Sequence, residues 1–260
     1  MEYENLLYET KERITIITIN RAEFLNTLTN KTKDELRDAF TRAKEDPVTK
    51  VIVWTATGEK AFSAGADVNE LAFLDSLSGK QIAQKAQALA QFIENLGKPT
   101  IASINGFAVG GAFELVLACT LRVASSNATF TLPEIKLGIM PGYGGTQRLS
   151  RLVGKGRAME IILSGEPIDA QEAFRIGLIN KVFPQESLRE ETMKFAEKFA
   201  QKGAIALNLA MEAINRGLDL PLEMGCEIEA SLAGSCWDTE DVKEGLKAFL
   251  EKRKPMFKDR

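Results

Sequence analysis

The sequence predicts an α/β fold that is followed by a helical C-terminal segment. Short β-branched, apolar segments alternate with amphipathic helical patterns over the first two-thirds of the chain, and the last quarter carries helical patterns alone. The chain has 260 residues, of which 45% are hydrophobic and 27% charged, an ordinary globular composition. A chain of this length can bury a sizeable core without disulfides or metals.

The first elements follow from hydrophobic spacing. Residues 13–19 are β-branched and apolar, which is typical of a strand. Residues 31–45 carry apolar side chains at helical spacing, and Pro47 should stop that helix. The next expected elements are a strand at 51–54, a helix at 80–96 and a strand at 100–104.

The second half of the chain changes from strands to helices. Strands are expected at 121–124, 129–132 and 180–183, and the chain after residue 185 reads as successive helices broken at Gly203, Gly217 and Pro221. We place a boundary near residue 195, which separates a core domain, 1–195, from a helical segment, 196–260.

The composition excludes several kinds of site and partner. The chain has no histidine, so a Ser-His-Asp or Cys-His centre and a histidine-ligated zinc site are excluded. Its three cysteines are far apart, which favours a reducing, cytoplasmic location and predicts no metal site. A net charge of -3 disfavours nucleic-acid binding. We expect no secretion signal and no membrane span.

Glu114 is the most informative residue for chemistry. It is the only charged side chain in the apolar segment 106–119. Burial there would raise the pKa of its carboxyl group and make it a candidate acid or base. The alternative is a structural ion pair with a buried arginine such as Arg122.

Two glycines precede Glu114 at the expected start of a helix. Gly110 and Gly111 would let a ligand approach free backbone N–H groups, which is what an oxyanion-stabilising site needs. Tight helix packing explains the same glycines equally well.

Glu134 and the loop 60–67 are less specific signals. Glu134 follows Pro133, and such a glutamate most often only begins a helix. The loop is rich in small residues that suit contact with a ligand, although Asp67 could simply cap the segment after it. The glycine-rich segments at 142–145 and 154–156 fit neither a Rossmann fingerprint nor a P-loop.

Three motifs follow one another along the chain: AFSAGAD at 61–67, INGFAVGGAFEL at 104–115 and LPEIKLGIMPGYGGTQRL at 132–149. In this order and spacing they resemble the motifs of the crotonase, or enoyl-CoA hydratase, superfamily. The resemblance covers nearly the whole chain. It implies a spiral of ββα units, a C-terminal helical segment for trimerisation, and trimers that usually pair into hexamers.

The resemblance also implies the site residues. Glu114 and Glu134 match the two catalytic glutamates of the hydratases, and the backbone N–H groups of Ala64 and Gly111 would form the oxyanion hole. The substrate-binding residues it implies are Ala64, Gly65, Ala66, Asp67, Gly111, Pro141, Gly142, Phe249 and Lys252. Phe249 and Lys252 would hold the CoA nucleotide, often across a subunit boundary.

The function that the resemblance implies is reversible addition of water to a short-chain trans-2-enoyl-CoA, without a metal or cofactor. The acyl-CoA is the expected partner. One alternative is an isomerase, or a specialised hydroxyacyl-CoA dehydratase, on the same scaffold. A second alternative, of another class, is a non-catalytic scaffold that binds acyl-CoA or RNA. The residues leave open which glutamate is the acid and which is the base.

Overall fold

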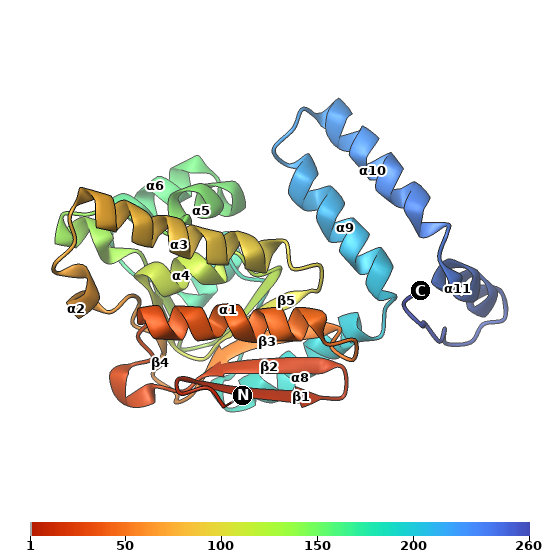
Figure 1. Cartoon of the computed structure of the whole chain (residues 1–260), viewed down its shortest axis with the longest axis horizontal. Helices are drawn as coiled ribbons and strands as arrows, with labels where there is room; N and C mark the ends of the chain where they lie inside the picture. Colours follow the sequence, from red (N-terminus) through yellow and green to blue (C-terminus); the bar gives the residue numbers. More distant parts are fainter. Residues whose placement is uncertain (1) are drawn as a thin grey trace.

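A computed structural model describes residues 2–260 as two β-sheets surrounded by helices (Figure 1). The larger sheet has six strands in the order β1-β2-β3-β5-β7-β10. Its strands are β1 (Leu6–Lys11), β2 (Ile14–Ile19), β3 (Val51–Ala56), β5 (Thr100–Ile104), β7 (Leu121–Ser125) and β10 (Lys181–Phe183). All neighbouring strands in it are parallel except the β1–β2 hairpin.

The smaller sheet has four strands in the order β4-β6-β8-β9. They are β4 (Ala61–Ser63), β6 (Phe107–Val109), β8 (Thr129–Thr131) and β9 (Ile168–Asp169). β4, β6 and β8 are parallel, whereas β9 pairs antiparallel with β8.

Each turn of the chain adds one strand to each sheet. β3 and β4, β5 and β6, and β7 and β8 divide between the sheets in this way, and helices follow each pair. The first two pairs are followed by α2 (Val68–Leu71) with α3 (Ser76–Glu94), and by α4 (Gly110–Val116). This arrangement is the predicted spiral of ββα units.

The core has two parts, one on each face of the six-stranded sheet. On one face Trp54 packs edge-on against Phe40 and Phe62, with ring centroids 5.9 and 5.2 Å apart, and α1 (Asn30–Glu45), α3 and α4 cover this face. On the other face α8 (Leu188–Ala200) buries Leu188 and Ala196. Strand side chains alternate between the faces, which separates the two parts.

The remaining helices follow the spiral. They are α5 (Gly145–Val153), α6 (Lys155–Ser164), α7 (Ala170–Arg175), α9 (Ala204–Gly217), α10 (Leu222–Cys236) and α11 (Glu240–Leu250). α9 and α10 form a hairpin that extends away from the sheets, and neither helix has a buried residue (Figure 1).

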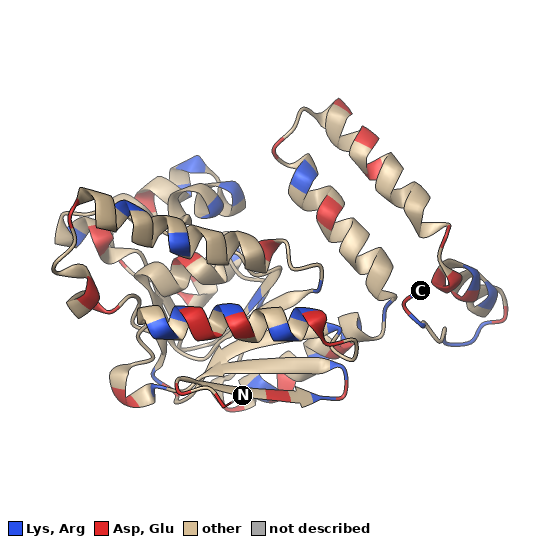
Figure 2. Cartoon of the chain, viewed as in Figure 1, with Lys and Arg blue, Asp and Glu red and all other residues tan. Residues whose placement is uncertain are grey.

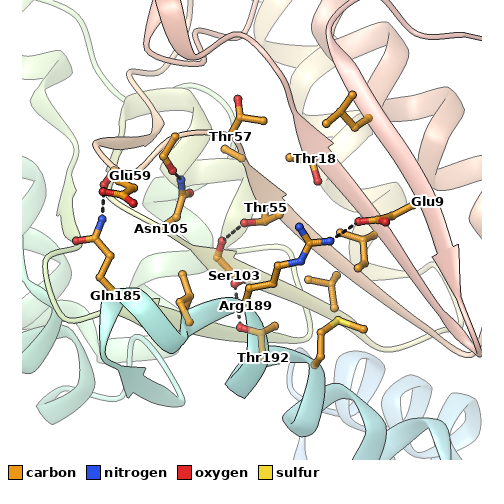
Figure 3. Close-up of a pocket in the computed structure, with 17 residues that line it drawn as sticks. Glu9, Thr18, Thr55, Thr57, Glu59, Ser103, Asn105, Gln185, Arg189 and Thr192 are labelled. Carbon is orange, nitrogen blue, oxygen red and sulfur yellow. Dashed lines mark hydrogen bonds and ion pairs between the residues drawn. The ribbon is translucent and has the colours of Figure 1, made fainter.

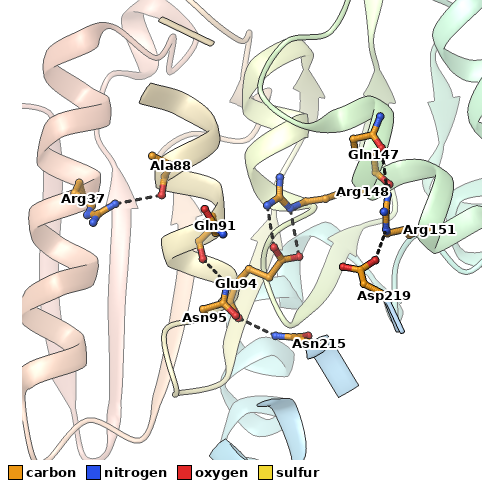
Figure 4. A network of polar contacts seen from close by, with 10 residues as sticks. All are labelled: Arg37, Ala88, Gln91, Glu94, Asn95, Gln147, Arg148, Arg151, Asn215 and Asp219. Atoms are coloured by element: carbon orange, nitrogen blue, oxygen red, sulfur yellow. Dashed lines mark hydrogen bonds and ion pairs between the residues drawn. The ribbon is translucent and has the colours of Figure 1, made fainter. Parts of the chain in front are cut away.

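Polar contacts join the hairpin to the spiral near the C-terminal end of α3 (Figure 4). Glu94 accepts two hydrogen bonds from the Arg148 guanidinium, and its backbone carbonyl accepts one from Asn215 of α9. Arg151 forms an ion pair with Asp219, just after α9, at 3.1 Å. These contacts hold the turn end of the hairpin against the spiral.

The predicted elements of the spiral are present, with ends that move by a few residues. The sequence interpretation missed β1 and the short strands β4, β6 and β9. The division at residue 195 stays a prediction, although α8 runs across that point and packs on the sheet. The helices that leave the core begin at Ala204.

Charged side chains of both signs are interspersed along the outer helices, as α1 shows in Figure 2. Within residues 2–260 no helix is both long enough and apolar enough to cross a membrane.

Candidate active site

Glu114 lies on α4, a helix whose residues are all buried. Its side chain is 1% exposed, and one oxygen, Oε1, accepts hydrogen bonds from the N–H groups of Tyr143 at 2.8 Å and Gly145 at 2.7 Å. Arg122 instead donates to the carbonyl oxygens of Cys119 and Leu178. The alternative of an ion pair between Glu114 and Arg122 is therefore wrong.

The surroundings of Glu114 favour its protonated form. Burial raises the pKa of the carboxyl group, the N–H group of Gly145 opposes that effect, and the charge of Glu134 adds to it, which brings the pKa to about 7. A carboxyl group with a pKa near neutrality can both accept and release a proton under ordinary conditions. This is the property that a general acid–base residue requires.

Glu134 comes from the 3-10 helix Pro133–Leu137, directly after β8. The backbone of Glu134 lies at the start of a helix, as its position after Pro133 indicates. Its side chain, however, turns toward α4. A Cβ built on Gly110 would lie 2.8 Å from Glu134 Oε1, and Gly110 has a φ of +53°, so only glycine suits this position. Glu134 Oε2 is buried and has no hydrogen-bond partner among the described residues.

The two carboxylates therefore lie near each other beside α4. Glu114 belongs to that helix, Glu134 Oε1 lies beside Gly110 at its start, and the charge of Glu134 acts on the pKa of Glu114. Burial raises the pKa of Glu134 as well. An unpaired buried oxygen is costly unless a ligand or water binds it, so the site is suited to hold a polar reactant between the carboxylates.

The structure corrects one of the two predicted oxyanion donors. The N–H group of Ala64 donates to the carbonyl oxygen of Leu25 at 2.9 Å, so it is not available to a ligand. Ala66, two residues later, donates no backbone hydrogen bond within the part of the chain described here. The N–H group of Gly111 lies in the first turn of α4, where it has no partner within the helix.

Close packing brings the loop of Ala66 to the start of α4. Gly65 has a φ of +95°, and a Cβ on it would lie 2.8 Å from the carbonyl oxygen of Val109, which precedes α4. Only glycine permits this approach. The geometry therefore favours Ala66 and Gly111 as the donor pair. Asp67 caps α2 by accepting from the N–H group of Asn69 at 3.0 Å, which confirms the structural role considered for it.

The loop after Glu134 closes over the site. Pro141 is buried, and the carbonyl oxygen of Gly142 accepts from Gln87 of α3 at 2.8 Å. Tyr143 follows, and its ring lies so close to Gly111 that a Cβ there would be 2.5 Å from Cε2. Tyr143 lies in the third motif, and only the folded structure shows that its N–H group holds Glu114.

Phe249 and Lys252 do not reach this site within one chain. Phe249 lies on α11 and is 81% exposed, and Lys252 follows that helix with a φ of +54°. α11 lies at the opposite side of the molecule from α2 and α4 (Figure 1). Their predicted role in CoA binding stays a prediction and requires a neighbouring subunit.

A cavity of about 340 Å³ lies on the other face of the six-stranded sheet, beneath α8. Ser103 and Thr192 meet there at 2.9 Å, and Arg189 pairs with Glu9 (Figure 3). No predicted site residue lines this cavity. Its walls carry neither Glu114 nor Glu134, so the candidate acid–base residues belong to the face that α4 covers.

No cluster of three metal-ligating side chains occurs within residues 2–260. All three cysteines are free, and Cys119 is buried.

Comparison with known proteins agrees with this geometry. A family model described as enoyl-CoA hydratase/isomerase matches residues 9–260. A crotonyl-CoA hydratase from Syntrophomonas wolfei is 43% identical over 99% of both chains, and a short-chain-enoyl-CoA hydratase from Clostridium acetobutylicum is 40% identical over 98% of this chain and 97% of the relative. The structure of an enoyl-CoA hydratase from Bacillus anthracis matches with a TM-score of 0.95 at 40% identity, covering 99% of this chain and all of the other.

Proposed function

Because this chain belongs to the enoyl-CoA hydratase/isomerase family, we propose that Glu114 and Glu134 together add water to the double bond of a short trans-2-enoyl-CoA. The chain is an enoyl-CoA hydratase. The short acyl group is supported by the names of its relatives, a crotonyl-CoA and a short-chain-enoyl-CoA hydratase. The observation that carries the proposal is the proximity of two carboxylates beside α4, the buried Glu114 and the half-buried Glu134 with its unpartnered Oε2.

The proposed mechanism begins at the thioester. The N–H groups of Ala66 and Gly111 donate to the thioester oxygen and stabilise the negative charge that develops on it. Both groups are free for this purpose, as described above. Polarising the carbonyl makes the β-carbon electrophilic, which prepares it for attack by water.

The carboxylates then move the protons. Glu114 takes a proton from the water whose oxygen bonds to the β-carbon, and Glu134 delivers a proton to the α-carbon. Dehydration is the reverse, and the two glutamates could exchange these roles. One water adds across the double bond, and no group of the protein is oxidised or reduced. The proposed reaction therefore needs no cofactor.

Replacing Glu134 with glutamine tests the proposal directly. Glu134→Gln should lower kcat for crotonyl-CoA hydration by ~10²–10⁴, because a positioned acid–base group contributes about that much. Binding of acetyl-CoA, measured by calorimetry, should change little. Hydration at the parental rate would contradict the assignment. Double-bond isomerisation without hydration would favour the isomerase alternative.

The choice of Ala66 over Ala64 has its own test. Ala66→Pro removes the proposed donor and should lower kcat/KM by about 10²–10³, the usual cost of losing one oxyanion donor. Circular dichroism and thermal unfolding should show a folded protein. If kcat/KM stays within about threefold of the parent, Ala66 is not the donor.

We also propose that the protein works as a trimer or as a pair of trimers in the cytoplasm. The exposed apolar residues of α9, α10 and α11 support assembly, since monomers rarely expose such patches. Assembly would bring Phe249 and Lys252 to a neighbour's CoA site. The free cysteines fit a reducing compartment.

A further inference from the structure

Lys33 is a buried lysine beside the active site. It lies on α1 in the row of residues that faces the core, three positions before Leu36 and seven before Phe40. The residue is 5% exposed. Its ammonium group contacts the hydroxyl of Tyr143 at 3.4 Å and lies 5.3 Å from the centre of that ring.

This ammonium group lacks an anionic partner. It has three protons to donate, and the Tyr143 hydroxyl is its one hydrogen-bond partner among the described residues. The nearby carboxylates are engaged elsewhere: Glu70 accepts from the N–H group of Asn30 at 3.0 Å, and Asp34 pairs with Lys85 at 2.7 Å. Burial of a charge without a partner costs several kcal/mol, so ordinary packing gives no reason for a lysine here.

Tyr143 connects Lys33 to the reaction centre. The backbone N–H group of Tyr143 holds Glu114, its ring packs on Gly111, and its hydroxyl reaches Lys33. Lys33 therefore lies beyond the far end of this ring, as seen from the carboxylates. In the proposed mechanism the thioester oxygen binds the N–H groups of Ala66 and Gly111, and the Tyr143 ring packs on Gly111. The acyl chain beyond the double bond must therefore pass beside Tyr143.

We propose that Lys33, with the Tyr143 hydroxyl, binds a carboxylate at the end of the acyl group. The proposal rests on the hydratase function and makes the substrate a short enoyl thioester with an anionic tail. A carboxylate there satisfies the buried ammonium group by charge-assisted hydrogen bonds. A methyl-terminated acyl group of the same length leaves the ammonium group without an acceptor.

Burial also affects the charge of Lys33 in the free protein. Desolvation lowers the pKa of the ammonium group, and the charge of Glu70 partly opposes that effect. A carboxylate that binds beside Lys33 restores the preference for the charged form. The lysine and its ligand thus stabilise each other's ionised states.

Two substrates of similar size measure this preference. They are trans-4-carboxybut-2-enoyl-CoA and trans-2-hexenoyl-CoA, which differ by a carboxylate in place of an ethyl group. The readout is the ratio of their kcat/KM values for hydration, the carboxylate substrate over the apolar one. We expect a ratio above one for the parent and a loss of ~10–100-fold in that ratio for Lys33→Met, because a hydrogen bond to a charged group contributes about 1.5–3 kcal/mol.

Lys31→Met is the matched control. It removes a lysine of the same helix whose side chain is 56% exposed, so the ratio should stay at the parental value. Tyr143→Phe keeps the ring and removes the hydroxyl, and it should lower the ratio several-fold. This second variant decides the matter if Lys33→Met does not fold.

The outcomes separate the two proposals. The role of Lys33 is overturned if the parental ratio is below one. It is also overturned if Lys33→Met, or a folded Tyr143→Phe, leaves the ratio unchanged. In either case the hydratase function stands. Failure of the parent to hydrate either substrate or crotonyl-CoA instead overturns the proposed function. A ratio that falls in Lys31→Met to the same extent shows a general charge effect and also overturns the specific role.

Discussion

Glu114 shows how a single residue combines folding and function. Its raised pKa means that the folded protein binds more protons than the unfolded chain between about pH 4.5 and pH 7. Stability should therefore fall as the pH rises through this window, by up to about 3 kcal/mol above pH 7. The site carries this cost because a buried carboxyl group is what the chemistry needs.

Glu114→Gln should remove that pH dependence. Its amide oxygen can still accept from the N–H groups of Tyr143 and Gly145, so packing is retained. We expect the variant to be more stable than the parent at pH 8 and nearly equal at pH 4.5, as urea unfolding would measure. The control Glu186→Gln, at an exposed position, should show no such change between the two pH values. An equal gain for Glu114→Gln at both would contradict burial as the cause.

Lys33 is the residue that sequence reasoning passed over, although a signal was present. It lies in the same buried stripe as Leu36, Phe40 and Ala43, on the helix predicted over residues 31–45. A lysine in such a stripe is an exception to the periodicity. Periodicity alone could not say whether the side chain reaches solvent, and its contact with Tyr143 joins positions 110 residues apart.

At the scale of elements, the α9–α10 hairpin depends on a close approach of two glycines near its turn. A Cβ built on Gly225 would lie 3.5 Å from Gly217 Cα, which is ordinary contact, and the γ-methyl groups of a larger residue would be added beside the α9 backbone. The sequence interpretation took Gly217 only as a helix break. In the structure it is also the surface against which α10 packs.

Gly225→Val should therefore destabilise the hairpin by about 1–3 kcal/mol, the usual cost of overpacking. Gly225→Ala is the control, and it should be neutral or slightly stabilising because alanine favours a helix. Urea unfolding measures the free energies of unfolding, and light scattering measures the assembly. Equal stability of the two variants would show that the glycines are not in tight contact.

The short strands explain what element prediction missed. β4 and β6 have three residues each, too few to show a period of two. They pair with each other because each follows one of the neighbouring strands β3 and β5, which bring them side by side. β5 and β7 are five residues long and almost wholly buried, so their apolar runs identified them.

At the scale of the whole molecule, the C-terminal helices expose an apolar surface. Ile214, Leu222, Trp237, Phe249 and Leu250 are each at least 61% exposed, and all belong to or adjoin the helices that leave the spiral. The C-terminal tail is held in place by an ion pair between Lys50 and Asp259 at 2.7 Å, so this surface has a defined shape. A defined apolar surface is suited to contact with further copies of the chain.

We accordingly expect the molar mass in solution to correspond to three or six chains. Light scattering after size-exclusion chromatography, over a tenfold or wider range of micromolar concentration, would measure it. Phe249→Glu should weaken the assembly by placing a charge in the apolar contact. A mass of one chain at every concentration would contradict both the assembly and the proposed role of Phe249 and Lys252.

The sequence by itself determined the α/β class and pointed to Glu114, because apolar periodicity and an isolated carboxylate are local features. The family, the ββα spiral and the role of Glu134 followed from the resemblance of the three motifs to the superfamily. Only the tertiary structure decided which N–H groups are free. Ala64 and Ala66 look alike in the sequence, but in the folded chain the N–H group of Ala64 donates to the carbonyl oxygen of Leu25. The partners of Lys33 and Glu114 were likewise decided by folding, since hydrogen bonds between distant segments depend on how the elements pack and not on their spacing in the chain.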